Sequence, residues 1–87
     1  MSFKILLHPK AAHFLRKAEP TVKNRIKDRL RELQDTPEKG ERLNPPFRRL
    51  RIGDYRAIYE VDRDKRRAII LFIGHRREVY DDFSRLL

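Results

Sequence analysis

Residues 49–61 read RLRIGDYRAIYEV, and their pattern predicts the central part of the fold. Leu50 and Ile52 alternate with arginines, which is the pattern of a strand with one buried face. Gly53-Asp54 is typical of a tight turn, and a second strand follows it from 55 to 61. We therefore expect an antiparallel hairpin at the centre of the molecule.

The chain after this hairpin predicts one more strand and a short helix. The continuous apolar run from Ala68 to Ile73 is typical of a central strand, and it completes a three-stranded antiparallel meander. Val79, Phe83 and Leu86 then recur at helical spacing, so residues 77–87 predict a short C-terminal helix that is marginal by itself.

The chain before the hairpin predicts a strand and two helices. Alternation over residues 3–7 predicts a strand that ends before Pro9. Prolines 9 and 20 each open a helix, the first with Ala12 and Leu15 on one side. The second helix carries an apolar stripe at spacings of four, four and three, made of Val22, Ile26, Leu30 and Leu33. Residues 38–46 predict a connecting loop anchored by Leu43.

These elements predict a single α+β domain over residues 1–87. Its order is strand, helical hairpin, three-stranded antiparallel meander and short C-terminal helix, and the two helices pack on one side of the sheet. A chain of 87 residues is too short for a two-domain enzyme. It has no cysteine and no long apolar run, so we expect an intracellular protein of the cytoplasm with no membrane association.

The charge of the chain predicts a polyanionic partner. Twenty-two Lys and Arg face thirteen Asp and Glu, which leaves a net charge of +9. Fifteen of these cations are arginines, whose planar forks grip phosphates, so the balance favours RNA or DNA. The alternative interpretation is a soluble surface held by ion-pair networks.

Alternation along the first hairpin strand predicts one cationic face. If Leu50 and Ile52 face the helices, Arg49 and Arg51 project from the opposite face. Arg56 follows the turn and Arg76 follows the central strand, so the four guanidinium groups can converge on one phosphate-binding concavity. The alternative is that these arginines pair with carboxylates across a solvated face, each pair contributing about 0 to 1 kcal/mol.

The same segments supply groups that can move protons. RNA cleavage without a metal needs a base for the 2′-hydroxyl, charge stabilisation at phosphorus and an acid for the 5′-oxygen. Arginine serves the second task but stays protonated, so Tyr80 and His75 are the candidates for proton transfer. Tyr55 can stack on bases or pack at the sheet edge, and Arg48 is a further candidate for phosphate binding. The spacing of His8 and His13 fits no metal motif, and we expect neither a metal nor a cofactor.

Together, residues 49–61 and the segment IGHRREVY at 73–80 resemble the RelE/ParE toxin superfamily. The resemblance covers nearly the whole chain in element order, although the helical hairpin matches in pattern and not in motif residues. It implies a RelE-type toxin of a type II toxin-antitoxin system, a metal-independent endoribonuclease that cuts mRNA in the ribosomal A site by 2′-hydroxyl attack. It also implies a RelB-like antitoxin, and contact with operator DNA through the antitoxin complex.

The resemblance implies roles for individual residues. Arg56 corresponds to the arginine that stabilises the scissile phosphate, Arg76 to the arginine after the central strand, and Tyr80 to the tyrosine that stacks or deprotonates. Arg49 and Arg51 stand where RelE members carry lysines, which moves proton transfer towards Tyr80 or His75. Two alternatives stay open: a ParE-like inhibitor of DNA gyrase, and a non-catalytic basic module that binds RNA or protein.

Overall fold

The computed structural model describes residues 2–86, except for the side chains of Asp81, Asp82, Arg85 and Leu86. The elements are β1 (Lys4–Leu7), α1 (Pro9–Lys17), α2 (Pro20–Arg31), the 3-10 helix η1 (Glu32–Gln34), β2 (Glu41–Arg42), β3 (Phe47–Ile52), β4 (Tyr55–Asp62), β5 (Arg67–His75) and α3 (Val79–Leu86). Within the described residues, five strands form one sheet in the order β1-β5-β4-β3-β2. The edge strand β1 is parallel to β5, and the other neighbours are antiparallel, so the predicted α+β fold is confirmed.

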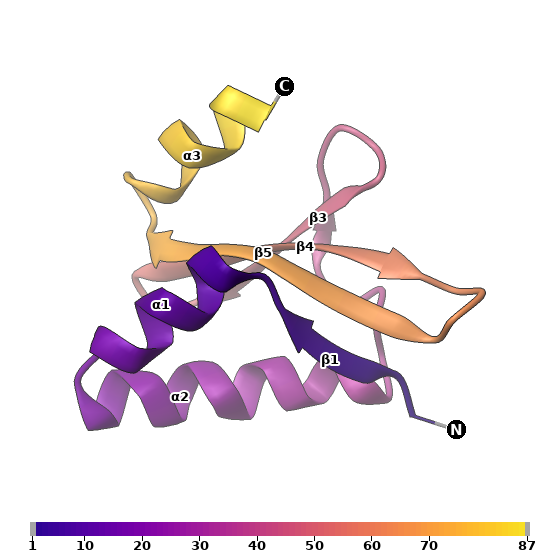
Figure 1. Ribbon diagram of the computed structural model, residues 1–87, viewed down its shortest axis with the longest axis horizontal. Helices are drawn as coiled ribbons and strands as arrows, with labels where there is room; N and C mark the ends of the chain where they lie inside the picture. Colours follow the sequence, from indigo (N-terminus) through magenta and orange to yellow (C-terminus); the bar gives the residue numbers. More distant parts are fainter. Residues whose placement is uncertain (1, 87) are drawn as a thin grey trace.

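Helices cover the two faces of the sheet unequally. Helices α1 and α2 lie against one face, and α3 lies over the other (Figure 1). Pro9 and Pro20 stand in the first turns of α1 and α2, as predicted, and the Nδ1 atom of His8 accepts the backbone N–H of Lys10 at 3.2 Å to cap α1. Among residues 2–86, no helix is long and apolar enough to cross a membrane.

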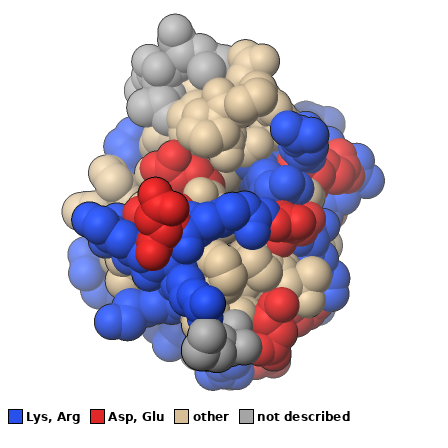
Figure 2. Space-filling view, turned by 90° about the vertical axis from the view of Figure 1, so that its right-hand side faces the viewer, with Lys and Arg blue, Asp and Glu red and all other residues tan. Residues whose placement is uncertain are grey.

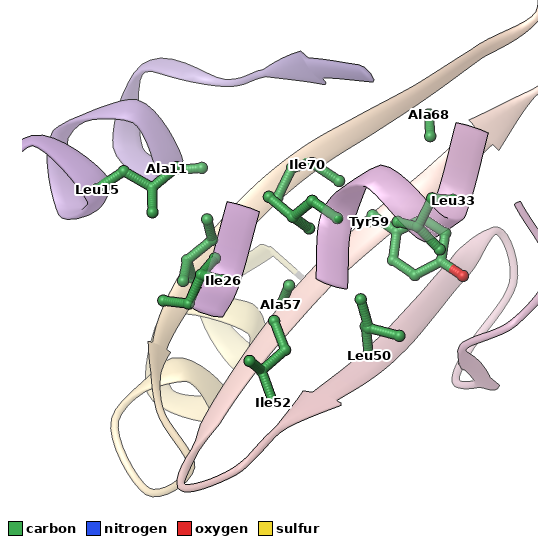
Figure 3. Close-up of a cluster of buried hydrophobic side chains, with 12 residues drawn as sticks. Ala11, Leu15, Ile26, Leu33, Leu50, Ile52, Ala57, Tyr59, Ala68 and Ile70 are labelled. Carbon is green, nitrogen blue, oxygen red and sulfur yellow. The ribbon is translucent and has the colours of Figure 1, made fainter. Parts of the chain in front are cut away.

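The main core fills the space between the sheet and helices α1 and α2 (Figure 3). The predicted stripe of the second helix is confirmed, because Ile26, Leu30 and Leu33 are buried and Val22 packs at the margin of the core. In α1 the prediction is wrong by one position. Ala11 is fully buried in place of Ala12, since Ala11 and Leu15 are four residues apart and face the sheet together.

A smaller core lies on the opposite face, beneath α3. It contains Ile58, Phe72, Val79 and Phe83, and the rings of Phe47 and Phe83 meet edge to face with their centroids 5.2 Å apart. Leu43 packs here, as predicted for the anchor of its loop. The predicted inward position of Leu86 concerns a side chain outside the described residues. This second core holds α3 over the end of the sheet that carries the predicted site.

Two boundaries differ from the prediction. The loop predicted at 38–46 contains β2, whose Glu41 and Arg42 pair with Arg49 and Arg48. A strand of two residues is too short to leave an alternation pattern, so sequence periodicity misses it. Strand β5 also continues through Gly74 to His75, because it pairs with β4 up to Tyr55. The extension brings His75, a predicted site residue, into the sheet.

Candidate functional site

Three arginines project from the α3 face of the hairpin β3–β4. Leu50 and Ile52 are buried in the main core, so alternation places Arg49 and Arg51 on the other face, as predicted. Arg56 of β4 is the direct cross-strand partner of Arg51. Like charges placed opposite each other disfavour folding, so this pair costs stability unless an anion lies between them. We call Arg49, Arg51 and Arg56 the arginine face.

Arg49 is the most constrained member of the arginine face. Its guanidinium donates one hydrogen bond to the hydroxyl of Tyr80 and another to the carboxylate of Glu41. The guanidinium carbon lies 5.8 Å from the centre of the Tyr80 ring. The hydrogen bond to Glu41 raises the pKa of Arg49 above its usual range, and the bond to Tyr80 raises it to a smaller extent. Tyr80 therefore enters the site through α3, as the sequence predicted.

Glu41 is a member of this network that the sequence reasoning missed. It accepts from Arg49, and its Oε1 atom lies 3.0 Å from Nε of Arg51. The hydrogen bond from Arg49 lowers the pKa of Glu41, and the charges of Arg51 and Arg56 lower it further. Glu41 stands in the segment predicted as a loop, and its register opposite Arg49 in β2 is the signal that would have found it.

Arg56 and Arg76 lie at the end of the sheet where β3 turns into β4 and where β5 ends. Nη1 of Arg56 donates to the carbonyls of Gly53 at 2.7 Å and Tyr55 at 2.8 Å, so its guanidinium is turned towards its own hairpin turn. Gly53 makes this turn possible with a φ of +61°. Arg76 follows β5 with an exposed side chain, and its backbone N–H donates to Asp54 at 2.8 Å.

The three chain segments meet where α3 begins. Gly74 pairs with Arg56 across the sheet, and a Cβ on Gly74 would lie 3.5 Å from the Cβ of Val79, next to Tyr80. The segments that carry Arg56, Arg76 and Tyr80 are therefore neighbours. No hydrogen bond or ion pair links the side chain of Arg76 to another side chain that the structure describes.

His75, Tyr55 and Arg48 lie on the other face of the sheet, so the predicted grouping is wrong for them. Tyr55 and His75 are cross-strand partners with ring centroids 6.0 Å apart, and Tyr55 also meets Phe14 of α1 at 5.9 Å. Arg48 donates to the carbonyls of Glu38 at 3.2 Å and Gly40 at 3.0 Å. The reason is parity, since neighbouring residues of a strand point to opposite faces. Their roles in binding or catalysis stay predictions.

The arrangement offers anion binding and a route for protons. The arginine face presents guanidinium donors suited to phosphate oxygens, with a phenol and a carboxylate in the same network. Lys and Arg side chains also dominate the surface in Figure 2, where Asp and Glu are interspersed among them. Among the described residues, no three His, Asp or Glu side chains gather as the ligands of a metal would.

Comparison with known proteins identifies the family. A family model described as the ParE toxin of type II toxin-antitoxin systems, parDE, matches residues 5–80. The chain belongs to this family. It is thus a type II toxin of the RelE/ParE superfamily, as the resemblance implied. The comparison with curated proteins gave no match.

Solved structures similar to this toxin include RelE proteins. A substituted E. coli RelE toxin in the free state has a TM-score of 0.80 at 26% identity, and the match covers all of both chains. A RelBE2 toxin-antitoxin complex from Mycobacterium tuberculosis gives 0.79 at 22% identity over 87% of this chain and 100% of that chain. An archaeal RelE-RelB complex from Pyrococcus horikoshii gives 0.72 at 23%, over 90% and 99%.

Proposed function

We propose that this toxin is a ribosome-dependent endoribonuclease that cleaves mRNA in the A site without a metal. The observation that supports the proposal most strongly is the arginine face, with Tyr80 hydrogen-bonded to Arg49. Guanidinium groups gathered on one face of a sheet can stabilise the charge that develops on a phosphate during cleavage. A phenol beside them supplies a group that can accept a proton.

The proposed reaction follows from these positions. In its phenolate form Tyr80 accepts the proton of the 2′-hydroxyl, and the N–H of Arg49 is directed at its oxygen. The 2′-oxygen attacks phosphorus, and the bond to the 5′-oxygen breaks, which leaves a 2′,3′-cyclic phosphate and a 5′-hydroxyl. Arg49, Arg51 and Arg56 bind the phosphate oxygens and stabilise their added charge. Arg76 donates a hydrogen bond to the departing 5′-oxygen, which takes its proton from water.

His75, Tyr55 and Arg48 take secondary parts in this proposal. His75 and Tyr55 form an aromatic pair at the end of the sheet, on the face opposite Tyr80. We propose that they contact the RNA chain or the ribosome on that face, away from the cleaved phosphate. Arg48 supports the loop before β2 through the carbonyls of Glu38 and Gly40, so its effect on RNA binding is through Glu41 and Arg49.

The proposed protein partner is a RelB-like antitoxin. Several solved structures with this fold are RelB-RelE complexes, including those from M. tuberculosis and P. horikoshii. A net charge of +9 favours an acidic partner, and α3 is a short terminal element that a partner can displace. Residues 1–87 then act as one toxin domain in the cytoplasm, and the domain reaches operator DNA through the antitoxin complex.

Inhibition of DNA gyrase is the second candidate function. The observation that favours it is the family model itself, which is that of a ParE toxin and spans residues 5–80. A ParE-type toxin would not need the network of Arg49, Tyr80 and Glu41. A third possibility, a basic module that binds RNA or protein without cleaving, would use the same charge but no proton transfer.

One parallel experiment separates these functions. Purified toxin is added to ribosomes programmed with a defined mRNA, and the RNA ends are mapped. Gyrase supercoiling is assayed in parallel with the same preparation of toxin. New A-site ends with a 2′,3′-cyclic phosphate support the proposal. Inhibited supercoiling with intact mRNA contradicts it and selects the ParE-type function. If the mRNA stays intact and supercoiling continues, the binding module is selected.

A further inference from the structure

A cavity at the edge of the sheet lies beside the arginine face. It has a volume of about 200 Å³ and opens between α2 and the β2–β3 edge. Its lining is Arg29, Lys39, Gly40, Glu41, Arg49, Leu50 and Arg51. Four of these seven residues are cations, and they come from α2, from the loop before β2 and from β3. The cavity is thus a cationic pocket. Arg49 and Arg51 have a part in the proposed reaction, but Arg29 and Lys39 have none.

Two carboxylates hold these four cations in pairs. Glu41 binds Arg49 and Arg51, while Glu32 of η1 accepts from Arg29 at 2.7 Å and from Lys39. Hydrogen bonds, from Lys39 to Glu32 and from Arg49 to Glu41, lower the pKa of both carboxylates, so both are charged at neutral pH. Four positive charges against two negative charges leave the pocket cationic by two.

The backbone around the pocket is fixed in place. Nη2 of Arg29 donates to the carbonyl of Arg51 at 3.0 Å, which ties α2 to the open edge of β3. Gly40 lets the loop approach the sheet closely, since a Cβ there would lie 2.7 Å from the carbonyl oxygen of Arg49. The Nε atom of Arg49 is buried and has no hydrogen-bond partner among the described residues. The cations are therefore positioned before any ligand arrives, and one buried donor is still unused.

We propose that this pocket binds a second phosphate of the RNA, adjacent to the phosphate on the arginine face. The inference rests on the proposed function and names a further part of its substrate site. Arg49 and Arg51 belong both to the pocket and to the arginine face, so anions in the two places must be neighbours. A polynucleotide presents neighbouring anions along one chain, and guanidinium forks match phosphate oxygens.

The internal carboxylates define how the phosphate enters. The phosphate takes the place of Glu41 at Arg51 and of Glu32 at Lys39, because an anion that competes for the same donors must displace the one already bound. Removal of the Glu41 charge therefore strengthens phosphate binding, and removal of the Lys39 charge weakens it. Two substitutions in one pocket thus have opposite effects, which a general change in stability would not produce.

The test uses the full chain and short RNA that cannot be cleaved. Three 2′-O-methyl dinucleotides of one sequence are compared: one without a terminal phosphate, one with a 5′-phosphate and one with a 3′-phosphate. Dissociation constants are measured by calorimetry at fixed salt. We expect at least one terminal phosphate to tighten binding by about three- to tenfold, which corresponds to roughly 0.7 to 1.4 kcal/mol.

Matched variants assign this gain to the pocket. Lys39→Gln should abolish the gain, Glu41→Gln should increase it, and Lys4→Gln, at an exposed position on the opposite edge strand β1, should leave it unchanged. Lys39 is exposed, so its substitution leaves the core intact, and a thermal melt verifies this. The proposal is overturned if neither phosphate adds affinity, if the gain persists in Lys39→Gln, or if Lys4→Gln loses it equally.

Failure of this inference differs from failure of the proposed function. The dinucleotides are uncleavable and no ribosome is present, so the phosphate gain is measured whether or not the toxin cuts mRNA. If ribosomal cleavage is observed but neither terminal phosphate adds affinity, the pocket is free for carboxylates of a protein partner and the reaction on the arginine face is unaffected.

Discussion

At the scale of single residues, the hydroxyl of Tyr59 anchors the segment that carries Glu41. The side chain is fully buried, donates to the carbonyl of Pro37 at 2.7 Å and accepts from the N–H of Gly40 at 2.9 Å. Burial raises the pKa of this phenol, so it stays neutral and can make both bonds. One buried oxygen thereby fixes the loop that leads into β2.

Tyr59→Phe tests this anchor. Without the oxygen, the N–H of Gly40 and the carbonyl of Pro37 lose a buried partner, so we expect the free energy of unfolding to fall by about 1–3 kcal/mol. Denaturant unfolding measures the change. Tyr55→Phe is the matched control, because the hydroxyl of Tyr55 makes no hydrogen bond with another described residue, and it should have a smaller effect. Equal losses in the two variants would contradict the anchoring role.

The carboxylates of Glu32, Glu41 and Asp62 predict how stability depends on pH. Hydrogen bonds to cations or to a backbone N–H lower all three pKa values, from 4.5, 4.5 and 3.8. Since the folded pKa lies below the unfolded one, the stabilisation is complete above the unfolded value and is lost as pH falls through the folded value. Stability should therefore decline with acid below about pH 4.5.

Glu41→Gln isolates one part of this acid response. The variant lacks one titrating carboxylate, so its unfolding free energy should fall less steeply than that of the wild type below about pH 4.5. Denaturant unfolding is followed across this range, with Glu60→Gln as the control outside the network. A stability that rises on acidification, or parallel curves for Glu41→Gln and the wild type, would refute the assignment.

The sequence predicts the residues of the arginine face better than it predicts their partners. Alternation with Leu50 and Ile52 correctly assigns the face of Arg49 and Arg51, because the period of a strand depends on neighbouring residues alone. The pairing of Glu41 with Arg49 depends on contacts between strands, and no local pattern contains it. The face of His75 is likewise not evident from the sequence, because His75 has a defined face only if β5 continues past Gly74.

At the scale of elements, α3 is joined to the rest of the fold by a small apolar contact. Val79 and Phe83 provide its buried side chains, and the ring of Phe83 meets Phe47 edge to face. This cluster is separate from the main core between the sheet and helices α1 and α2. Detachment of α3 therefore exposes Ile58 and Phe72 but leaves the main core packed.

Phe83→Ala should release α3 without unfolding the sheet. A buried phenylalanine contributes about 3–5 kcal/mol, which exceeds what a helix of two turns can lose and stay docked. We expect amide hydrogens of residues 79–86 to exchange much faster, while those of β4 and β5 keep their protection. Ser84→Ala, on an exposed position of the same helix, is the control. Equal acceleration in β4 and β5 would show that α3 belongs to the main cooperative unit.

Elements with a long periodic pattern are predicted well, and those without one are not. The apolar stripe of α2 recurs over several helical turns, so the sequence shows both that it is a helix and which side is buried. The continuous apolar run of β5 indicates a central strand. Strand β2 has two residues and owes its existence to β3 and to the anchored loop before it. An element that forms through tertiary contacts leaves no local signal of this kind.

At the scale of the whole molecule, charge and fold have different relations to function. A net charge of +9 favours a polyanion, but it is compatible with mRNA, with DNA and with an acidic antitoxin. The chain matches the family model of ParE toxins, and its fold is shared by a solved RelE toxin. The distinguishing chemistry lies in the arrangement of the arginine face and Tyr80.

If the arginine face of this toxin cleaves mRNA, the single-turnover rate of cleavage on programmed ribosomes must depend on its guanidinium groups. Arg56→Ala removes a cation of the proposed reaction, whereas Arg16→Ala removes an exposed cation of α1 on the other face. With both variants folded, we expect Arg56→Ala to cleave mRNA at least about 100-fold more slowly than the wild type. Arg16→Ala should cleave at the wild-type rate. Equal cleavage rates for Arg56→Ala and the wild type would contradict the account.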